Sequence, residues 1–493
     1  MYSIYPHLLT ILHFTALSGL AVYGLHRLWL LWHWHHEKKK EQFAPLRDRR
    51  LPIEPCPFVT VQLPVYNERF VAERLLDAAA AIEWPQDKLE IQVLDDSTDD
   101  TSAIVAARAA FWSHKGVAMQ VLKRPHRKGY KAGALEAGRI IAQGEFIAVF
   151  DADFVPPPDF LRRTIPYFAD GKIGMVQAKW GFLNGEHSWL TALQALLLGP
   201  HFTIEHWTRS RKSLFFNFNG TAGIWRSRAI ESAGGWQDDT VTEDLDLSYR
   251  AQLAGWRFHY LDNLVVPSEL PITLASFRSQ QQRWAKGSIQ TAKKILPVLF
   301  RTKLPWAVKA EAVAHLLANV GWLLGALVTL TLYPTIIARS GIGPYQIMRV
   351  DVPLFLFTSG AIFLYFFHYQ QLHSKEFPLP VLFILPVFAI GMAPSIALSV
   401  IKGLFRQGGR FDRTPKFGIK GRAQLPSSAF LYRQRSLPYL FMNIALFAYT
   451  LLPGCYAWQR NTWVAVPLLT VLPLGFLVMI YRDLRELTFK SMC

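Results

Sequence analysis

Two hydrophobic patterns divide the chain. Between residues 52 and 300, short apolar segments alternate with longer segments that mix apolar and polar residues. Four of the apolar segments have the length of strands, at 58–63, 91–94, 119–122 and 147–150, and helices are predicted from residue 68 and over 101–114. Strands and helices that alternate along a chain are typical of a mainly parallel sheet, so we expect an α/β domain over residues 50–300.

The second pattern is a set of long apolar runs on both sides of this domain. The first covers about residues 8–32 of an N-terminal segment, 1–37, and is followed by Lys38, Lys39 and Lys40. Such runs predict membrane-spanning helices, and the lysines predict an outside N-terminus and a cytosolic α/β domain. A cleaved signal peptide is the alternative, but its basic residues would precede the apolar run. The later runs lie at 312–337, 353–372, 378–401, 438–457 and 463–481.

A basic segment at 402–435 limits how many of these runs cross the membrane. It holds nine Lys and Arg residues against one acidic residue, Asp412. Basic segments stay cytosolic, so one of the five later runs does not cross. We assign this role to 378–401 as an interfacial or re-entrant helix, because its prolines break a straight helix. The chain then has two spans in 312–372, two in 438–481 and a cytosolic tail at 482–493.

Composition supports a membrane protein that binds anionic groups. The 493 residues are 51% hydrophobic, which is too long and too apolar for one soluble domain. The formal net charge of +17 suits anionic lipid headgroups and a phosphorylated ligand. Nucleic-acid-binding proteins rarely carry several membrane spans, so no nucleic-acid partner is expected. Cys56, Cys455 and Cys493 are too few for a disulfide framework or a zinc site.

Two carboxylates, Asp151 and Asp153, follow the apolar segment 147–150 directly, and three prolines at 156–158 end the strand. Residues i and i+2 of a strand point the same way, and ligands bind at the carboxyl ends of parallel strands. Such a pair can hold a divalent cation, Mg²⁺ or Mn²⁺, which in turn holds a diphosphate. The alternative is a solvated Asp pair.

Two further polar segments lie in the first half of the domain. Asp95 and Asp96 follow the second strand, where one of them accepts hydrogen bonds from a nucleobase or both cap the next helix. Lys131 lies in a glycine-containing basic segment before a helix, which favours phosphate binding.

The second half of the domain adds a membrane-facing segment and a small-residue loop. Segment 188–212 mixes leucines with His and Arg, which predicts an amphipathic helix on the membrane surface or, alternatively, a core helix. Gly220 and Thr221 lie in a loop that would let a sugar approach closely.

Two further segments near the end of the domain contain candidate catalytic or binding residues. Glu243 and Asp244 precede a helix predicted over 247–253, and serve as N-terminal caps or as a general base. Gln280, Arg283 and Trp284 lie at the end of the domain, within an expected interfacial helix at about 270–300. An Arg can grip a diphosphate, and a Trp can stack on a sugar ring.

In this order, the Asp pair, the DxD, the Thr-Glu-Asp and the Gln-x-x-Arg-Trp motifs resemble the membrane-embedded inverting glycosyltransferases of family 2. Segments 64–68, 129–135 and 218–226 are most similar to the cellulose synthase-like A and C groups, which make mannan, glucomannan and glucan backbones. The resemblance covers residues 50–300 well and the membrane part loosely. It implies a GT-A-type, Rossmann-like domain attached to transmembrane helices.

The resemblance also implies a role for each motif. Tyr66, Glu68 and Asp96 would hold the base and ribose, with Asp95 beside them. Asp244 would be the catalytic base, and Asp151 and Asp153 the metal ligands. Lys131, Asp151, Gln280 and Arg283 would bind the nucleotide-sugar donor, with Gln280 and Arg283 on its diphosphate. The acceptor would be bound by Glu243, Trp284, Gly220 and Thr221.

Residues 411–416 resemble the F-x-V-T-x-K gating loop of cellulose synthases. Phe411, Thr414 and Lys416 match this pattern, whereas Arg413 replaces the Val. A basic loop beside the membrane is the alternative.

The function expected from these observations is processive, inverting β-glycosyl transfer. The donor would be UDP-glucose or GDP-mannose, with a slight preference for UDP-glucose. The expected product is a β-linked polysaccharide, with β-1,4 as the expected linkage, and it would pass through a multi-pass protein of the cell (inner) membrane. A glycolipid synthase that adds one sugar to ceramide or diacylglycerol is the alternative. Expected partners are the nucleotide sugar, a glycan or lipid acceptor and the bilayer, and accessory export proteins are compatible with this role.

Overall fold

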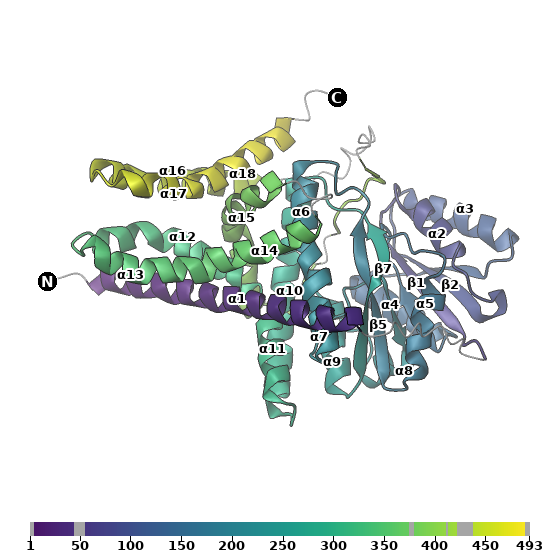
Figure 1. Ribbon diagram of the computed structural model, residues 1–493. Helices are drawn as coiled ribbons and strands as arrows, with labels where there is room; N and C mark the ends of the chain where they lie inside the picture. The colour runs from purple at the N-terminus through teal and green to yellow at the C-terminus, as the bar shows by residue number, and fades with distance from the viewer. Residues whose placement is uncertain (1–3, 44–54, 374–378, 411–412, 422–436, 489–493) are drawn as a thin grey trace.

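The computed structural model describes residues 4–43, 55–373, 379–410, 413–421 and 437–488. It consists of a sheet domain and a set of long helices, with α6, α10 and α11 between them (Figure 1). These three helices cover Trp189–Pro200, Leu274–Arg301 and Trp306–Leu316.

The domain is built on a seven-stranded sheet in the order β3-β2-β1-β4-β6-β5-β7. Strands β1, β2, β3 and β4 pair in parallel, and so do β5 and β7, whereas β6 pairs antiparallel with β4 and β5. The predicted mainly parallel α/β domain is therefore confirmed. The strands cover Val59–Val65, Leu89–Asp95, Met119–Lys123, Phe146–Val149, Ile173–Phe182, Gly223–Arg226 and Arg257–Ser268.

The central strand β4 is buried on both faces of the sheet. Ile147 and Val149 pack into one hydrophobic cluster, which includes residues of α4 and α6. Ala148 and Phe150 point the other way, into a cluster with α2 and α3. This alternation fixes the strand between two layers and places its carboxyl end beside those of β1 and β2. The helices of the domain are α2 (Ala72–Ala80), α3 (Thr101–His114), α4 (Tyr130–Ile141), α5 (Phe160–Thr164), α8 (Ser227–Ser232) and α9 (Glu243–Leu253).

The segment predicted as an amphipathic helix at 188–212 is helical, and it has both buried and exposed polar side chains, since Arg211 and Lys212 are exposed. It consists of α6, the π-helical turn η3 (His201–His206) and α7 (Trp207–Arg211). His206 and Arg209 have no exposed surface, because they find hydrogen-bonding partners inside the protein. The first part of the segment is thus packed inside the protein, whereas its end is exposed.

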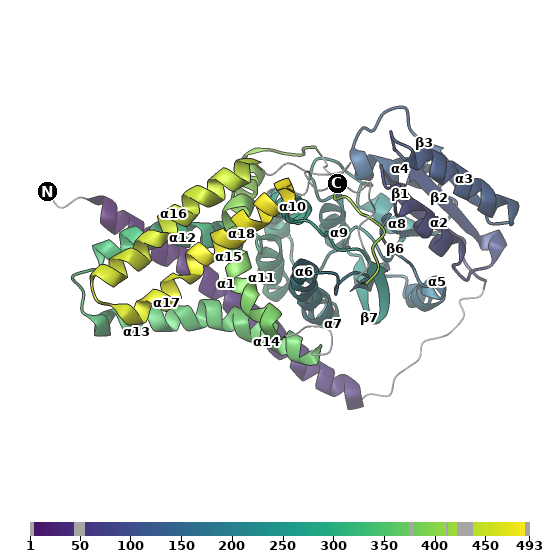
Figure 2. The ribbon, with the colours of Figure 1, turned by 90° about the horizontal axis from the view of Figure 1, so that it is seen from above.

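Six helical stretches of the described chain are long and apolar enough to cross a membrane. They belong to α1 (Ile4–Phe43), α12 (Val320–Ala338), α13 with η4 and α14 (Pro344–Leu372), α15 (Leu379–Phe405), α16 (Leu437–Gln459) and α17 with α18 (Val466–Thr488). These helices lie on one side of the sheet domain (Figure 1), and the view from above shows that α16 and α18 cross α1 (Figure 2).

Helix α15 is the segment predicted not to cross the membrane. It continues through Pro386 and Pro394 without a break, so the prolines do not make it re-entrant. It lies along α10, and the contacts follow the same order in both helices. Phe388 packs on Phe277 with ring centroids 5.8 Å apart, and the carbonyl oxygens of Ser395 and Leu404 accept hydrogen bonds from Gln282 and Lys293.

The first residues of the predicted C-terminal tail belong to the end of α18. Residues up to Thr488 are helical, and the Asp483 carboxylate lies 3.1 Å from both terminal nitrogens of Arg278 on α10. Glu486 accepts a hydrogen bond from the backbone N–H of Leu274, 2.5 Å away, at the first residue of α10. Both carboxylates satisfy charges or N–H groups of α10, which explains why this segment stays folded.

Candidate active site

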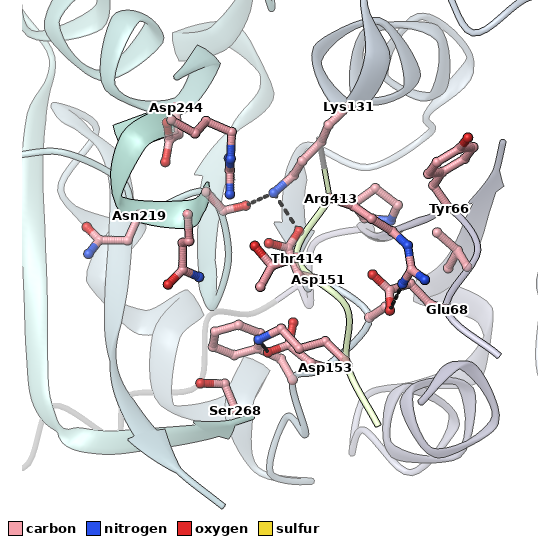
Figure 3. Close-up of a pocket in the computed structure, with 18 of the residues that line it drawn as sticks. Tyr66, Glu68, Lys131, Asp151, Asp153, Asn219, Asp244, Ser268, Arg413 and Thr414 are labelled. Atoms are coloured by element: carbon pink, nitrogen blue, oxygen red, sulfur yellow. Dashed lines mark hydrogen bonds and ion pairs between the residues drawn. The ribbon is translucent and has the colours of Figure 1, made fainter. Parts of the chain in front are cut away.

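A single pocket contains most of the residues predicted to act together (Figure 3). It lies where the carboxyl ends of β1, β2 and β4 meet the start of α9 and the first turns of α10. The lining includes Tyr66, Glu68, Asp96, Lys131, Asp151, Asp153, Gly220, Glu243, Asp244, Gln280, Arg283, Trp284, Thr414 and Lys416.

Asp151 and Asp153 enter the pocket from the loop after β4, and each is paired with a lysine. Asp151 Oδ1 lies 2.5 Å from Lys131 Nζ on α4, and Asp153 Oδ2 lies 2.7 Å from Lys416 Nζ. Burial raises the pKa of the Asp151 carboxyl, although the Lys131 ammonium opposes this shift. The pocket thus holds two carboxylates, each of which forms an ion pair with a lysine.

This pair fits a divalent cation that also binds a diphosphate. Hard cations such as Mg²⁺ are held by one or two carboxylates, while substrate phosphates and water supply the other ligands. Among the described residues, no group of three or more His, Cys, Asp or Glu side chains is arranged to hold a metal. The donor set therefore suits a cation that binds together with its nucleotide.

Asp244 lies in the first turn of α9, which begins at Glu243 and thus earlier than the predicted helix over 247–253. Burial raises the pKa of Asp244 to about 7, Glu243 adds to the shift, and Lys131 opposes it. Its Oδ1 accepts the N–H of Leu245 at 2.9 Å. A carboxylate with a pKa near neutrality can be both ionised and basic enough to remove a proton from a hydroxyl group.

Gly220 brings the loop after α7 close to this carboxylate. Its backbone has a φ of +81°, and its carbonyl oxygen accepts a hydrogen bond from Lys131 Nζ at 2.8 Å. A Cβ atom at this position would lie 3.0 Å from Asp244 Oδ2. Thr221, predicted to bind the acceptor, is instead fully buried, and its hydroxyl oxygen accepts the N–H of Asp151 at 2.8 Å.

Helix α10 supplies the pocket with Gln280, Arg283 and Trp284. It approaches the Thr-Glu-Asp segment closely, since a Cβ atom on Gly287 would lie 2.4 Å from the Thr242 side chain. Gln290 Oε1 on the same helix accepts the N–H of Val241 at 3.0 Å. These contacts bring two motifs that are distant in sequence to the same pocket.

The end of the pocket near β1 and β2 distinguishes the two candidate aspartates. Asp96 lines the pocket, and both of its oxygens are bound by Arg124, at 3.0 and 2.5 Å. Asp95 is buried outside the lining, where it accepts the N–H of Ser97 at 2.9 Å. Asp95 thus has the turn-forming role, and Asp96 alone faces the ligand space.

The segment 413–421 follows α15 in the chain and contributes residues to this pocket. Arg413 Nη1 lies 2.8 Å from Glu68 Oε2, and burial raises the pKa of Glu68 to about 8 although Arg413 opposes the shift. Thr414 and Lys416 line the pocket beside Asp151 and Asp153 (Figure 3). Phe411, the first residue of the predicted gating motif, lies outside the described residues.

Glu269, which follows β7, holds this segment and was missed in the sequence. Its side chain is 1% exposed and accepts three consecutive backbone N–H groups, at 2.7 to 3.1 Å. The donors are Phe417, Gly418 and Ile419. A carboxylate directly after an apolar strand was the available signal, the same one that identified Asp151.

Two further pocket residues were also missed. Asn219 adjoins Gly220, and its amide is held by His206 Nε2 at 2.6 Å and Asn217 Nδ2 at 3.0 Å. Arg127 lies over the ring of Tyr66, 3.4 Å from the ring centroid. Neither residue stands in a pattern that a sequence could distinguish from an ordinary loop.

Sequence comparisons find related proteins over the same part of the chain. Residues 56–287 match the family model described as glycosyltransferase-like family 2. Glucomannan 4-beta-mannosyltransferase 2 of Arabidopsis thaliana is 45% identical over 276 residues, covering 55% of this chain and 52% of the relative. Glucomannan 4-beta-mannosyltransferase 9 of the same plant is 39% identical over 332 residues, covering 66% of this chain and 61% of the relative. The chain thus spans about half the length of the curated relatives it matches.

A solved structure has a similar fold. It is a mannosyltransferase from Pyrobaculum calidifontis in complex with GDP-Man and Mn²⁺. The two structures superpose with a TM-score of 0.54 at 21% identity, over 80% of this chain and 99% of the other. At this identity the likeness concerns the fold.

Proposed function

We propose that this chain, whose residues 56–287 match the glycosyltransferase-like family 2 model, is a processive, inverting β-glycosyltransferase. It elongates a β-1,4-linked polysaccharide by transferring hexose, one residue at a time, from a nucleotide diphosphate sugar. The convergence of Asp151, Asp153, Asp244, Arg283 and Trp284 in one pocket carries this proposal. The names of the relatives support mannose as the transferred sugar.

The reaction is a single displacement. Asp244 accepts the proton of the acceptor hydroxyl, whose oxygen attacks the anomeric carbon from the face opposite the diphosphate. The C–O bond to the diphosphate breaks with its electron pair on the leaving group. Inversion of an α-linked donor therefore gives a β-linkage.

Other residues of the chain hold the leaving group and the acceptor. Arg283, with Gln280 and Lys131, neutralises and orients the diphosphate. A divalent cation held by Asp151 and Asp153 would stabilise the charge that grows on this group. Trp284 seats the terminal sugar of the acceptor.

The proposed membrane topology has five spans and an interfacial α15. Its support is twofold: α15 packs along α10, and the segment that follows α15 contributes Thr414 and Lys416 to the pocket. Six spans would place the segment after α15 on the opposite side of the membrane from the pocket. The N-terminus is then outside and the glycosyltransferase domain cytosolic. Reporter fusions at residues 345 and 420 test this, and an external reporter at 420 would contradict it.

The function is tested with the full chain in lipid nanodiscs, supplied with radiolabelled GDP-mannose or UDP-glucose and Mn²⁺. We expect label in an insoluble polymer that a β-1,4-glycanase degrades. Label that is extracted into chloroform would show a glycolipid synthase instead. EDTA should abolish incorporation and added Mn²⁺ or Mg²⁺ should restore it, whereas activity that survives EDTA would contradict the metal assignment.

A further inference from the structure

Arg127 lies at the end of the pocket near β1 and β2, where the base of the nucleotide is proposed to bind; this end is called the nucleotide end. It lies in the turn between β3 and α4, and its guanidinium carbon is 3.4 Å from the centroid of the Tyr66 ring and 4.9 Å from that of Tyr130. Arg127, Tyr66 and Asp96 all line the pocket. The two rings restrict the guanidinium group, because stacking on aromatic faces holds its plane.

The hydrogen-bond donors of Arg127 are unused in the described part of the chain. Its Nε is buried without an acceptor, and its guanidinium forms no hydrogen bond or ion pair with another described residue. A buried N–H group without a partner is costly, and in a ligand pocket the natural partner is the ligand. Arg127 therefore offers a fixed set of N–H groups to whatever enters this end of the pocket.

The nearby acceptors are already in use. Both Asp96 oxygens are bound by Arg124, and the Glu68 carboxylate is paired with Arg413. The nucleotide end therefore has free donors on Arg127 and acidic groups that are already neutralised. Such a site favours a base whose edge presents two adjacent acceptors.

Guanine has this edge. Its O6 and N7 atoms are adjacent acceptors that match the guanidinium fork, whereas adenine places an amino group beside N7. Uracil has a carbonyl oxygen between an N–H group and a C–H group, which leaves half of the fork without an acceptor. We propose that Arg127 binds O6 and N7 of guanine and selects a guanosine diphosphate sugar over a uridine diphosphate sugar. The proposal rests on the proposed function and names its donor, GDP-linked and not the UDP-linked sugar first favoured.

The test removes one acceptor atom from the ligand. GDP, 7-deaza-GDP and UDP are titrated by calorimetry into the wild-type chain in nanodiscs with Mn²⁺, and into R127A and R127K variants. Wild type should bind GDP about 10-fold more tightly than 7-deaza-GDP, which lacks the N7 acceptor, and UDP more weakly than GDP. In R127A the difference between GDP and 7-deaza-GDP should disappear. R127K keeps the charge but loses the fork, so it should bind GDP more weakly than wild type does.

Two results would overturn the assignment: equal wild-type affinity for GDP and 7-deaza-GDP, or tighter binding of UDP than of GDP. Both measurements use the wild-type chain, so they stand even if R127A does not fold. R162A is the matched control, because Arg162 is exposed and pairs with Glu83 far from the lining. Guanine selectivity without sugar transfer would refute the proposed function and keep this inference, whereas transfer from a UDP-sugar alone would do the reverse.

Discussion

Two buried clusters of charged residues in this protein differ in the pKa values of their carboxyl groups, which are raised in one cluster and lowered in the other. The first is the pocket with Glu68, Asp151, Asp153 and Asp244. The second, the ion network, joins the domain to the helices beside it. It consists of His26 and Arg27 on α1, Glu205 on η3, Arg209 on α7 and Glu311 on α11.

In the ion network every carboxylate has a guanidinium partner. Arg209 lies 2.8 Å from Glu311 and 3.2 Å from Glu205, and Glu205 also pairs with Arg27. Burial opposes ionisation, but Arg27 and Arg209 hold the pKa of Glu205 well below its usual range. The pKa of Glu311 is likewise lowered, because Arg209 and His26 outweigh burial. The charges of the network are therefore balanced, as expected of ion pairs that stabilise the packing of α1, η3, α7 and α11.

In the pocket the balance is incomplete. Burial raises the pKa of Asp244 to about 7 and that of Glu68 to about 8, in spite of the nearby Lys131 and Arg413. Lys131 and Arg413 compensate the burial of these carboxyl groups only in part, which costs stability in the free protein. A nucleotide, a cation and an acceptor hydroxyl can supply the missing partners, which explains why the imbalance is located at the pocket.

The largest effect is expected from Asp244→Asn. The amide cannot accept the acceptor's proton, so kcat should fall by about 10²–10⁴-fold in the incorporation assay. The thermal midpoint should not fall, since the change removes a poorly compensated buried charge. Asp87→Asn, at an exposed residue, is the control and should keep full activity. Undiminished transfer by D244N would remove Asp244 as the base.

Arg209→Met should lower the thermal stability, in contrast to Asp244→Asn, which should lower the activity without lowering the stability. It leaves Glu311 without its guanidinium partner and Glu205 with one fewer, and breaking a buried pair costs about 3–5 kcal/mol. We expect a clear fall in the thermal midpoint, followed by tryptophan fluorescence in detergent. Arg162→Met, in the exposed pair with Glu83, should cost less than about 1 kcal/mol. Equal thermal midpoints for Arg209→Met and Arg162→Met would show that the ion network does not stabilise the fold.

Gly220→Ala tests how closely the pocket is built around Asp244. The methyl group would lie 3.0 Å from Asp244 Oδ2, at a backbone φ of +81° that alanine adopts with strain. Misplacement of the base should lower kcat by up to about 100-fold. Gly171→Ala is the matched control, because a Cβ atom there meets no atom within 4 Å. Similar activity of both variants would contradict the close packing.

The smallest effect concerns pH, and the two clusters should respond in opposite directions. With an Asp244 pKa of about 7, kcat should rise roughly tenfold between pH 6 and 8 as the base ionises. The raised pKa values of Asp244 and Glu68 stabilise the fold at low pH, and this contribution is lost as pH rises through about 7 to 8. The lowered values of Glu205 and Glu311 stabilise the fold above the unfolded pKa, and this contribution is lost in acid.

Thermal midpoints of wild type and D244N between pH 5 and 9 check these signs. Between pH 5 and about 7, the folded pKa of Asp244, the variant should lose less stability than wild type, because only wild type has this carboxyl group to ionise. A wild-type midpoint that rises steadily up to pH 9 would contradict the raised pKa values in the pocket.

Local patterns predicted the sheet and most of the pocket. Strand β4 is apolar on both faces and ends in Asp151, and a parallel sheet brings such strand ends to one edge. Predictions that depended on burial were less successful. The polar residues of helix 188–212 predict a solvent-facing side. Arg209, one of these residues, instead donates a hydrogen bond to Glu311, which is more than 100 residues away in the chain. No local window contains both partners.

The sequence by itself determined which chemistry the chain can carry out and in what order its motifs appear. The tertiary structure alone decided that Asp96 and not Asp95 faces the pocket, and that Arg127 lies over Tyr66 without a side-chain acceptor among the residues that the structure describes. It also decided that the segment after α15 returns to the pocket. The physical reason is range: periodicity and motif spacing act over a few residues, whereas burial and charge pairing depend on segments that meet only when the chain is folded.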